Sequence, residues 1–219
     1  MFALGFFMPM KIQSITLWSF YARLLHGALA LAMLFLAFSG WLMGQITNDV
    51  EFWQEWHQIA GQVTVFLLLA RIWLFFQPGN SHFSRYKISA NDLQTILKTL
   101  KFYASLARSE LPPWFAINPV WRVLYALFYV LLVLLVISGL VDGQTLWLGI
   151  YWPSVHQSIA SFMLVWLIVH LIATVLHDSK SKVGRISAML SGVAYFESNS
   201  GVKPNEQQSV IETSFKLKK

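Results

Sequence analysis

The sequence predicts an all-α fold, a transmembrane four-helix bundle built from two similar helix hairpins. Hydrophobic residues make up 56% of the 219 residues and charged residues only 12%, with a mean hydropathy of +0.55. A soluble domain of this composition would expose a large apolar area. The two halves of the chain also repeat each other at a constant offset of 99 residues.

Four apolar runs are long enough to be membrane helices, at residues 24–46, 57–76, 120–141 and 155–176. Each is close to the ~20 residues that a helix needs to cross the hydrocarbon core. Backbone polar groups find no water there, so helices are expected. We expect one membrane domain at residues 11–195 and a polar, disordered cytoplasmic tail at 196–219.

The repeat is visible in residues that are sparse in apolar segments. Adding 99 takes Arg23 to Arg122, Ser39 and Gly40 to Ser138 and Gly139, Trp53 to Trp152, and His57 to His156. Chance alignment of common apolar residues does not explain these matches, which indicate two copies of a helix hairpin. The histidine pattern differs between the copies, because His26 maps onto Tyr125 and Arg71 maps onto His170.

The long connection between the second and third helices contains apolar residues at helical spacing. It predicts an amphipathic helix at residues 89–109 that lies on the cytoplasmic membrane surface. Asn118 and Pro119 form a start signal for the third helix. A second short interfacial helix is expected at residues 184–195.

The charge distribution predicts the topology. All sixteen Lys and Arg lie near the N-terminus, between the second and third helices, after the fourth helix, or at helix ends that face those segments. Residues 47–56 carry Asp49, Glu51 and Glu55 without a basic residue. The positive-inside rule therefore places both termini in the cytoplasm. Anionic lipid accounts for the net charge of +6, so no nucleic-acid partner is expected.

Four histidines lie in the apolar runs: His26, His57, His156 and His170. An intramembrane histidine is costly and indicates function, and four at matched depths are hard to explain as packed, hydrogen-bonded residues alone. His170 follows His156 by 14 residues, which is ~21 Å along a helix and ~40° short of four turns. Both therefore face nearly the same way.

Depth pairs His57 with His156 in the outer leaflet and His26 with His170 in the inner leaflet. The hypothesis is two b-type haems, each with two axial imidazoles on its iron, which suits the passage of single electrons. The chain has no cysteine, which excludes covalent c-type haem, thiolate-bound iron–sulfur clusters and disulfides.

The histidine pattern, together with residues 186–192 and with Pro112, Pro113, Asn118, Pro119 and Arg122, resembles a family. It is that of the bacterial cytochrome b subunits of nickel–iron hydrogenases, formate dehydrogenases and thiosulfate reductases, over residues 18–195. The resemblance implies a multi-pass protein of the bacterial cytoplasmic (inner) membrane. It also implies two b haems and electron relay between a periplasmic or membrane-anchored redox subunit and quinone, with the quinone near the inner haem.

Further residues are secondary candidates for these ligands. Arg23, Arg71 and Arg122 lie near the inner surface, where they would pair with haem propionates or a quinone headgroup, or with anionic lipid. His177 is a candidate proton donor to quinone, or an interfacial histidine without that role. The small Ser-Gly pairs at residues 39–40 and 138–139 would admit a macrocycle, or serve close helix packing.

Two other functions remain open at this point. One is a stand-alone oxidoreductase that exchanges electrons between a small periplasmic donor, such as superoxide or a soluble carrier, and quinone. The other is a haem-free transporter or assembly factor whose histidines relay protons. The repeat is parallel and lacks the broken helices of many inverted-repeat transporters, which argues against the second.

Overall fold

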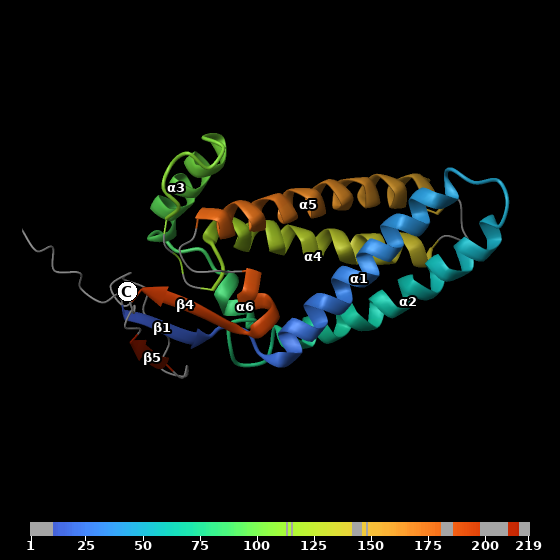
Figure 1. The fold of residues 1–219 in the computed structure, drawn as a ribbon. Helices are drawn as coiled ribbons and strands as arrows, with labels where there is room; N and C mark the ends of the chain where they lie inside the picture. Colours follow the sequence, from blue (N-terminus) through green and yellow to red (C-terminus); the bar gives the residue numbers. More distant parts are fainter. Residues whose placement is uncertain are drawn as a thin grey trace, which may run out of the picture.

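The computed structural model describes residues 11–112, 114, 116–141, 146–147, 149–180, 186–197 and 210–214. Four long helices run along a bundle (Figure 1). They are α1 (Phe20–Met43), α2 (Val50–Leu74), α4 (Pro119–Leu140) and α5 (Trp152–Lys180). Each is long and apolar enough to cross a membrane, and large apolar side chains are exposed along all four. The all-α transmembrane bundle is therefore confirmed.

The helices α1, α2 and α5 begin earlier than the apolar runs predict. α2 begins at Val50, seven residues before the predicted start. The apolar run did not include its first two turns, because they contain charged and aromatic residues. α5 likewise begins at Trp152. As a result, His57 lies about two turns inside α2 rather than at its start.

Side-chain caps fix the starts of α1 and α4. The Ser19 hydroxyl accepts a hydrogen bond from the Ala22 N–H at 3.2 Å. Asn118 Oδ1 accepts one from the Val120 N–H at 2.9 Å, and Pro119 occupies the first helical position. Both arrangements satisfy backbone donors that a helix start leaves unpaired. The start signal predicted at Asn118 and Pro119 is therefore confirmed.

The four helices form two hairpins. α1 packs along α2, α4 packs along α5, and α2 also contacts α4. All four contribute to a buried apolar core of Leu29, Leu68, Leu132, Leu135 and Met163. The hairpins are thus held together at the middle of the bundle.

A layer of shorter elements covers the end of the bundle opposite the α1–α2 turn (Figure 1). It contains the 3-10 helix η1 (Phe83–Tyr86) and the helix α3 (Asp92–Ala104). α3 is shorter than the predicted residues 89–109, since Leu106 and Ala107 have left-handed backbone conformations that end it. α3 buries Thr99 and Phe102.

The same layer contains a three-stranded antiparallel sheet in the order β4-β1-β5. Its strands are β1 (Lys11–Thr16), β4 (Val193–Glu197) and β5 (Val210–Ser214). The expected helix at residues 184–195 is wrong in part, because α6 (Ile186–Ser191) gives way to β4. The disorder expected for residues 196–219 does not hold for the strand residues, and residues 198–209 and 215–219 lie outside the described structure. The short strands β2 (Leu146–Trp147) and β3 (Ile150–Tyr151) pair in an antiparallel two-stranded ribbon.

Gly192 explains why α6 ends where it does. Its φ of +87° is accessible mainly to glycine, and a Cβ here would lie 2.9 Å from the Trp18 carbonyl oxygen. Its own carbonyl accepts hydrogen bonds from the N–H groups of Leu17 and Trp18. The segment after α5 is thereby tied to the start of α1.

Candidate functional site

The four intramembrane histidines form two pairs. His57 on α2 and His156 on α5 have ring centroids 6.3 Å apart. His26 on α1 and His170 on α5 have ring centroids 6.4 Å apart. The pairs are those that depth predicted, and α5 contributes one member to each.

The separation within each pair suits two trans ligands on one metal ion. A metal–imidazole bond is about 2 Å long and the nitrogen lies about 1 Å from its ring centre, so such a pair has centroids about 6 Å apart. In the described part of the chain no three His, Cys, Asp or Glu side chains cluster as a metal site. A haem held by two histidines would use two protein ligands on its iron, because the porphyrin supplies the other four.

The outer pair, His57 and His156, is surrounded in the same way in both hairpins. The Ser39 hydroxyl lies 2.8 Å from Nδ1 of His57, and the Ser138 hydroxyl lies 3.1 Å from Nδ1 of His156. A Cβ on Gly40 would lie 3.5 Å from His57 Cε1, and one on Gly139 would lie 3.2 Å from His156 Cε1. In the structure, the Ser-Gly pairs therefore contact the imidazoles themselves.

The inner pair, His26 and His170, is surrounded by aromatic rings. The Trp166 indole is stacked on His170, with an interplanar angle of 6° and centroids 5.1 Å apart. Trp121 and Tyr125 contact the same imidazole. Neither His170 Nδ1 nor Trp166 Nε1 has a hydrogen-bond partner among the described residues. Sequence reasoning missed Trp166, although it lies one helical turn before His170.

A cavity of about 440 Å³ lies at the inner pair, within the usual range of cofactor pockets, ~300–1,000 Å³. Its lining contains both imidazoles and the residues that the repeat relates to them, Tyr125 and Arg71. Arg71 is buried, donates from Nε to the Tyr129 hydroxyl at 2.8 Å, and contacts Ser81. No Asp or Glu is among the described residues that line the cavity. The cavity therefore suits a flat apolar group with an anionic edge.

A hydrogen-bonded chain extends from the inner pair toward the end of α5. Trp121 Nε1 donates to the Tyr103 hydroxyl at 2.6 Å, and this hydroxyl lies 2.7 Å from His177 Nε2. Burial raises the pKa of Tyr103 to about 12, so the phenol stays protonated. His177 is buried and lines the cavity. Nothing in the sequence indicated Tyr103 beyond its place on the amphipathic helix.

Two of the predicted arginines lie elsewhere. The Arg122 guanidinium forms an ion pair with Asp92 at 3.1 Å and also donates to the Lys87 carbonyl. Arg23 donates to the Leu190 carbonyl of α6. Neither is among the residues that line the cavity. Of the secondary candidates, the structure thus brings Arg71 and His177 to the inner pair.

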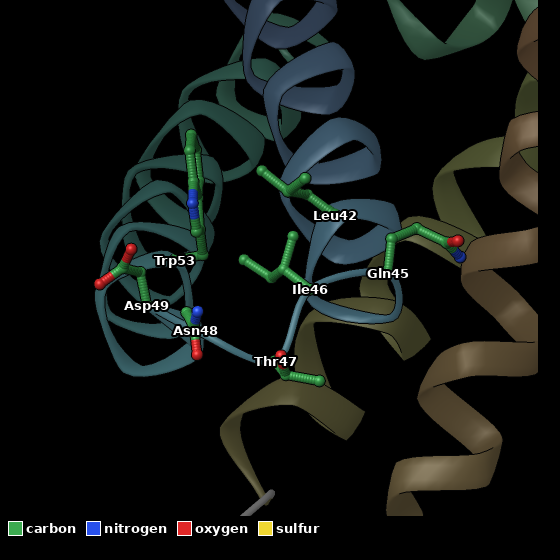
Figure 2. A pocket seen from close by; sticks show the side chains of 7 residues that line it. All are labelled: Leu42, Gln45, Ile46, Thr47, Asn48, Asp49 and Trp53. Atoms are coloured by element: carbon green, nitrogen blue, oxygen red, sulfur yellow. The ribbon is translucent and has the colours of Figure 1, made fainter.

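A second hollow, of about 430 Å³, lies at the α1–α2 turn. Figure 2 shows its lining side chains, from the end of α1 through the turn to the first residues of α2. They are Leu42, Gln45, Ile46, Thr47, Asn48, Asp49 and Trp53. Trp53 lies one turn before His57, so the hollow is on the outer pair's side of the bundle.

Comparison with protein families agrees with this geometry. The sequence model of the prokaryotic cytochrome b561 family matches residues 17–192. The chain belongs to this family. No curated protein and no solved structure shows significant similarity to it.

Family membership confirms the resemblance drawn from the histidines. The chain is a multi-pass protein of a bacterial membrane and a b-type cytochrome that takes part in electron transfer. This favours haem over the transporter hypothesis. The paired imidazoles fit b-type haem, and so does the cavity, whose described lining contains Arg71 and no Asp or Glu.

Proposed function

We propose that the cytochrome holds two b-type haems and relays electrons between a redox partner on the outer side of the membrane and the quinone pool. The observation that carries this proposal is that the histidines form two pairs, with ring centroids 6.3 and 6.4 Å apart. Each pair has one member on α5. With two imidazoles on each iron, haem supplies single-electron chemistry and no open coordination position.

The proposal assigns the outer haem to His57 and His156 and the inner haem to His26 and His170. Arg71 is the proposed partner of an inner-haem propionate, since it is a buried cation with hydroxyl partners and the described residues of the cavity wall include no carboxylate. Placing this cation against an anion would offset the cost of burying it.

We further propose quinone exchange near His177. The Tyr103 and His177 side chains are hydrogen-bonded at the end of the cavity, where α5 leaves the apolar layer. Reduction of a quinone to a quinol takes up two electrons and two protons. The electrons would come one at a time from the partner, and the His177 imidazole would exchange protons with the ligand.

The end of the bundle with the α1–α2 turn is the proposed partner side. Asp49, Glu51 and Glu55 lie there without a basic neighbour in residues 47–56. The basic residues at the opposite end support a cytoplasmic position for both termini. A basic or hydrogen-bonding surface on a periplasmic subunit would match this acidic turn.

The open hollow at the α1–α2 turn favours one alternative, a stand-alone enzyme that takes electrons from a small outer donor. Purification distinguishes the two. A metalloprotein subunit that co-purifies supports the relay, whereas quinone turnover by the isolated chain with a small donor supports the alternative.

Haem stoichiometry and redox difference spectra test the core of the proposal. Purified cytochrome from haem-replete cells should contain two haems per chain by the pyridine haemochrome assay. Quinol should reduce at least the inner haem in the difference spectrum. One haem per chain, or well-folded protein without iron, would contradict the dihaem assignment.

A further inference from the structure

Each histidine of the outer pair contacts a serine located 18 residues before it. The distances from the serine hydroxyl to Nδ1 are 2.8 Å for Ser39 with His57 and 3.1 Å for Ser138 with His156. Both serines are fully buried, with exposed fractions of 0% and 1%. Solvent therefore does not compete for these contacts, and their direction matters.

The helix carbonyls decide the direction. A serine hydroxyl has one hydrogen, and a carbonyl only accepts. The Ser138 hydroxyl donates to the Leu135 carbonyl at 2.9 Å, and the Ser39 hydroxyl donates to the Leu36 carbonyl at 3.3 Å. The Ser138 oxygen is therefore left as the acceptor of a hydrogen bond from His156, and the matching arrangement in the first hairpin supports the same direction for Ser39.

A second contact supports the same assignment for His156. Its Nδ1 also lies 3.2 Å from the Leu135 carbonyl oxygen, an atom that cannot donate. Nδ1 must then carry the proton. In a neutral imidazole this leaves the lone pair on Nε2, which is the nitrogen available to a metal.

The two hairpins contain the same arrangement at an offset of 99 residues, from the leucine whose carbonyl accepts the serine hydrogen bond to the histidine. The inner pair does not share it, because His170 Nδ1 has no hydrogen-bond partner among the described residues. Within the described residues, the serine contact to Nδ1 is thus found at both histidines of the outer pair and not at His170.

We propose that Ser39 and Ser138 are positioning residues that hold His57 and His156 with the proton on Nδ1 and so present both Nε2 atoms to one iron. The proposal rests on the dihaem function. A hydrogen bond from Nδ1–H makes the imidazole a more basic ligand, which favours the oxidised iron. The serines therefore lower the midpoint potential of the outer haem.

Redox titration of Ser39→Ala, Ser138→Ala and the double variant tests this proposal. We expect the outer-haem midpoint to rise by about 40 mV in Ser39→Ala, which is about a fivefold change for a one-electron couple. The inner-haem midpoint should not move. The ferric electron paramagnetic resonance signal of the outer haem should shift as well, because its ligand field changes.

The Leu135 carbonyl remains as an acceptor for His156 in Ser138→Ala, so Ser39→Ala and the double variant decide the result. If Ser39→Ala does not accumulate, Ser39→Gly takes its place with the same expected rise, and an unchanged midpoint there overturns the proposal. Ser161→Ala is the control, because this exposed α5 hydroxyl donates only to its own helix at Gln157. Its outer-haem midpoint should equal that of the wild type.

The outcomes separate the two levels of the argument. Wild-type protein without two haems defeats the dihaem function. Wild-type protein with two haems, whose outer midpoint and resonance signal are unchanged in Ser39→Ala and in the double variant, overturns only the role of the serines.

Discussion

Trp166 lies parallel to His170, with 6° between the ring planes and 5.1 Å between their centroids. No hydrogen bond to Nδ1 orients this imidazole within the described structure. The stacked Trp166 indole therefore fixes the orientation of the His170 ring. Such aromatic contacts contribute about 1 kcal/mol beyond the area they bury.

We therefore predict that Trp166→Leu broadens the ferric resonance signal of the inner haem and lowers its occupancy by a fewfold. Trp166→Phe retains a ring and should stay close to the wild type. Equal effects of the two variants would show that volume, rather than stacking, matters at this position. Haem content and electron paramagnetic resonance of purified protein measure both.

Replacing single ligands should remove different haems. We expect His57→Ala to abolish the outer-haem signal and His170→Ala the inner-haem signal, since each loses one of two protein bonds to iron. Optical redox titration separates the signals. Loss of the same signal in both variants would refute the pairing, and His82→Ala, in the loop, is the control that should keep both.

Arg71 should tune the inner haem. A cation beside a haem would favour the reduced form. At an effective dielectric constant of ~20, a separation of ~8 Å would be worth about 2 kcal/mol, or about 90 mV. Arg71→Gln should lower the inner midpoint by up to this amount, whereas Arg71→Lys keeps the charge and most of the effect. An inner midpoint that does not differ between Gln and Lys variants would exclude an electrostatic role.

The repeat offers a matched pair of glycines. A Cβ at position 139 would lie 3.2 Å from Cε1 and 3.4 Å from Nδ1 of His156, whereas one at position 40 would make an ordinary 3.5 Å contact with His57. Gly139→Ala should therefore lower outer-haem occupancy more than Gly40→Ala does. Haem-to-protein ratios measure the difference, and a reversed order would contradict the ring positions described here.

Asp92 makes the stability of the end layer depend on pH. Partial burial alone would raise the pKa of Asp92, but hydrogen bonds from Ser89 and the neighbouring Arg122 guanidinium hold it below its ordinary value. The stabilisation is then present above the unfolded pKa, about 3.9. It is lost as the pH falls through the lower folded value.

Asp92→Asn should cost up to ~1 kcal/mol at pH 7 for this partly exposed pair. The difference from the wild type should shrink below about pH 4. Thermal unfolding in detergent across this pH range measures it. Gln94→Ala, an exposed change on the same helix, should show no such pH dependence.

The sequence was sufficient for the four helices and for the two imidazole pairs. Hydrophobic runs report the membrane helices directly, and depth along a helix follows from residue count, so the pairing of His26 with His170 could be predicted. Helix starts were less accurate, because polar first turns such as that of α2 do not belong to an apolar run.

The three-stranded sheet and the hydrogen bonds between the serines and the histidines could not be predicted. β1, β4 and β5 are short and far apart in sequence, so no local pattern joins them. The Ser-Gly pairs were visible in the repeat, but their constant distance of 18 residues from a histidine was not used. That spacing, across a helix hairpin, was the signal for Ser39 and Ser138.

Because α5 holds one histidine of each pair, the distance between the two proposed haems would be set along a single helix. Looser packing within a hairpin would tilt the imidazole rings but would not change the distance along α5 between His156 and His170. Deleting one residue between positions 157 and 169 would instead swing His170 by about 100° around the helix and shorten its reach by about 1.5 Å. The distance over which an electron would pass between the two proposed haems is therefore set by the number of residues between His156 and His170. This segment should tolerate substitutions far better than insertions or deletions.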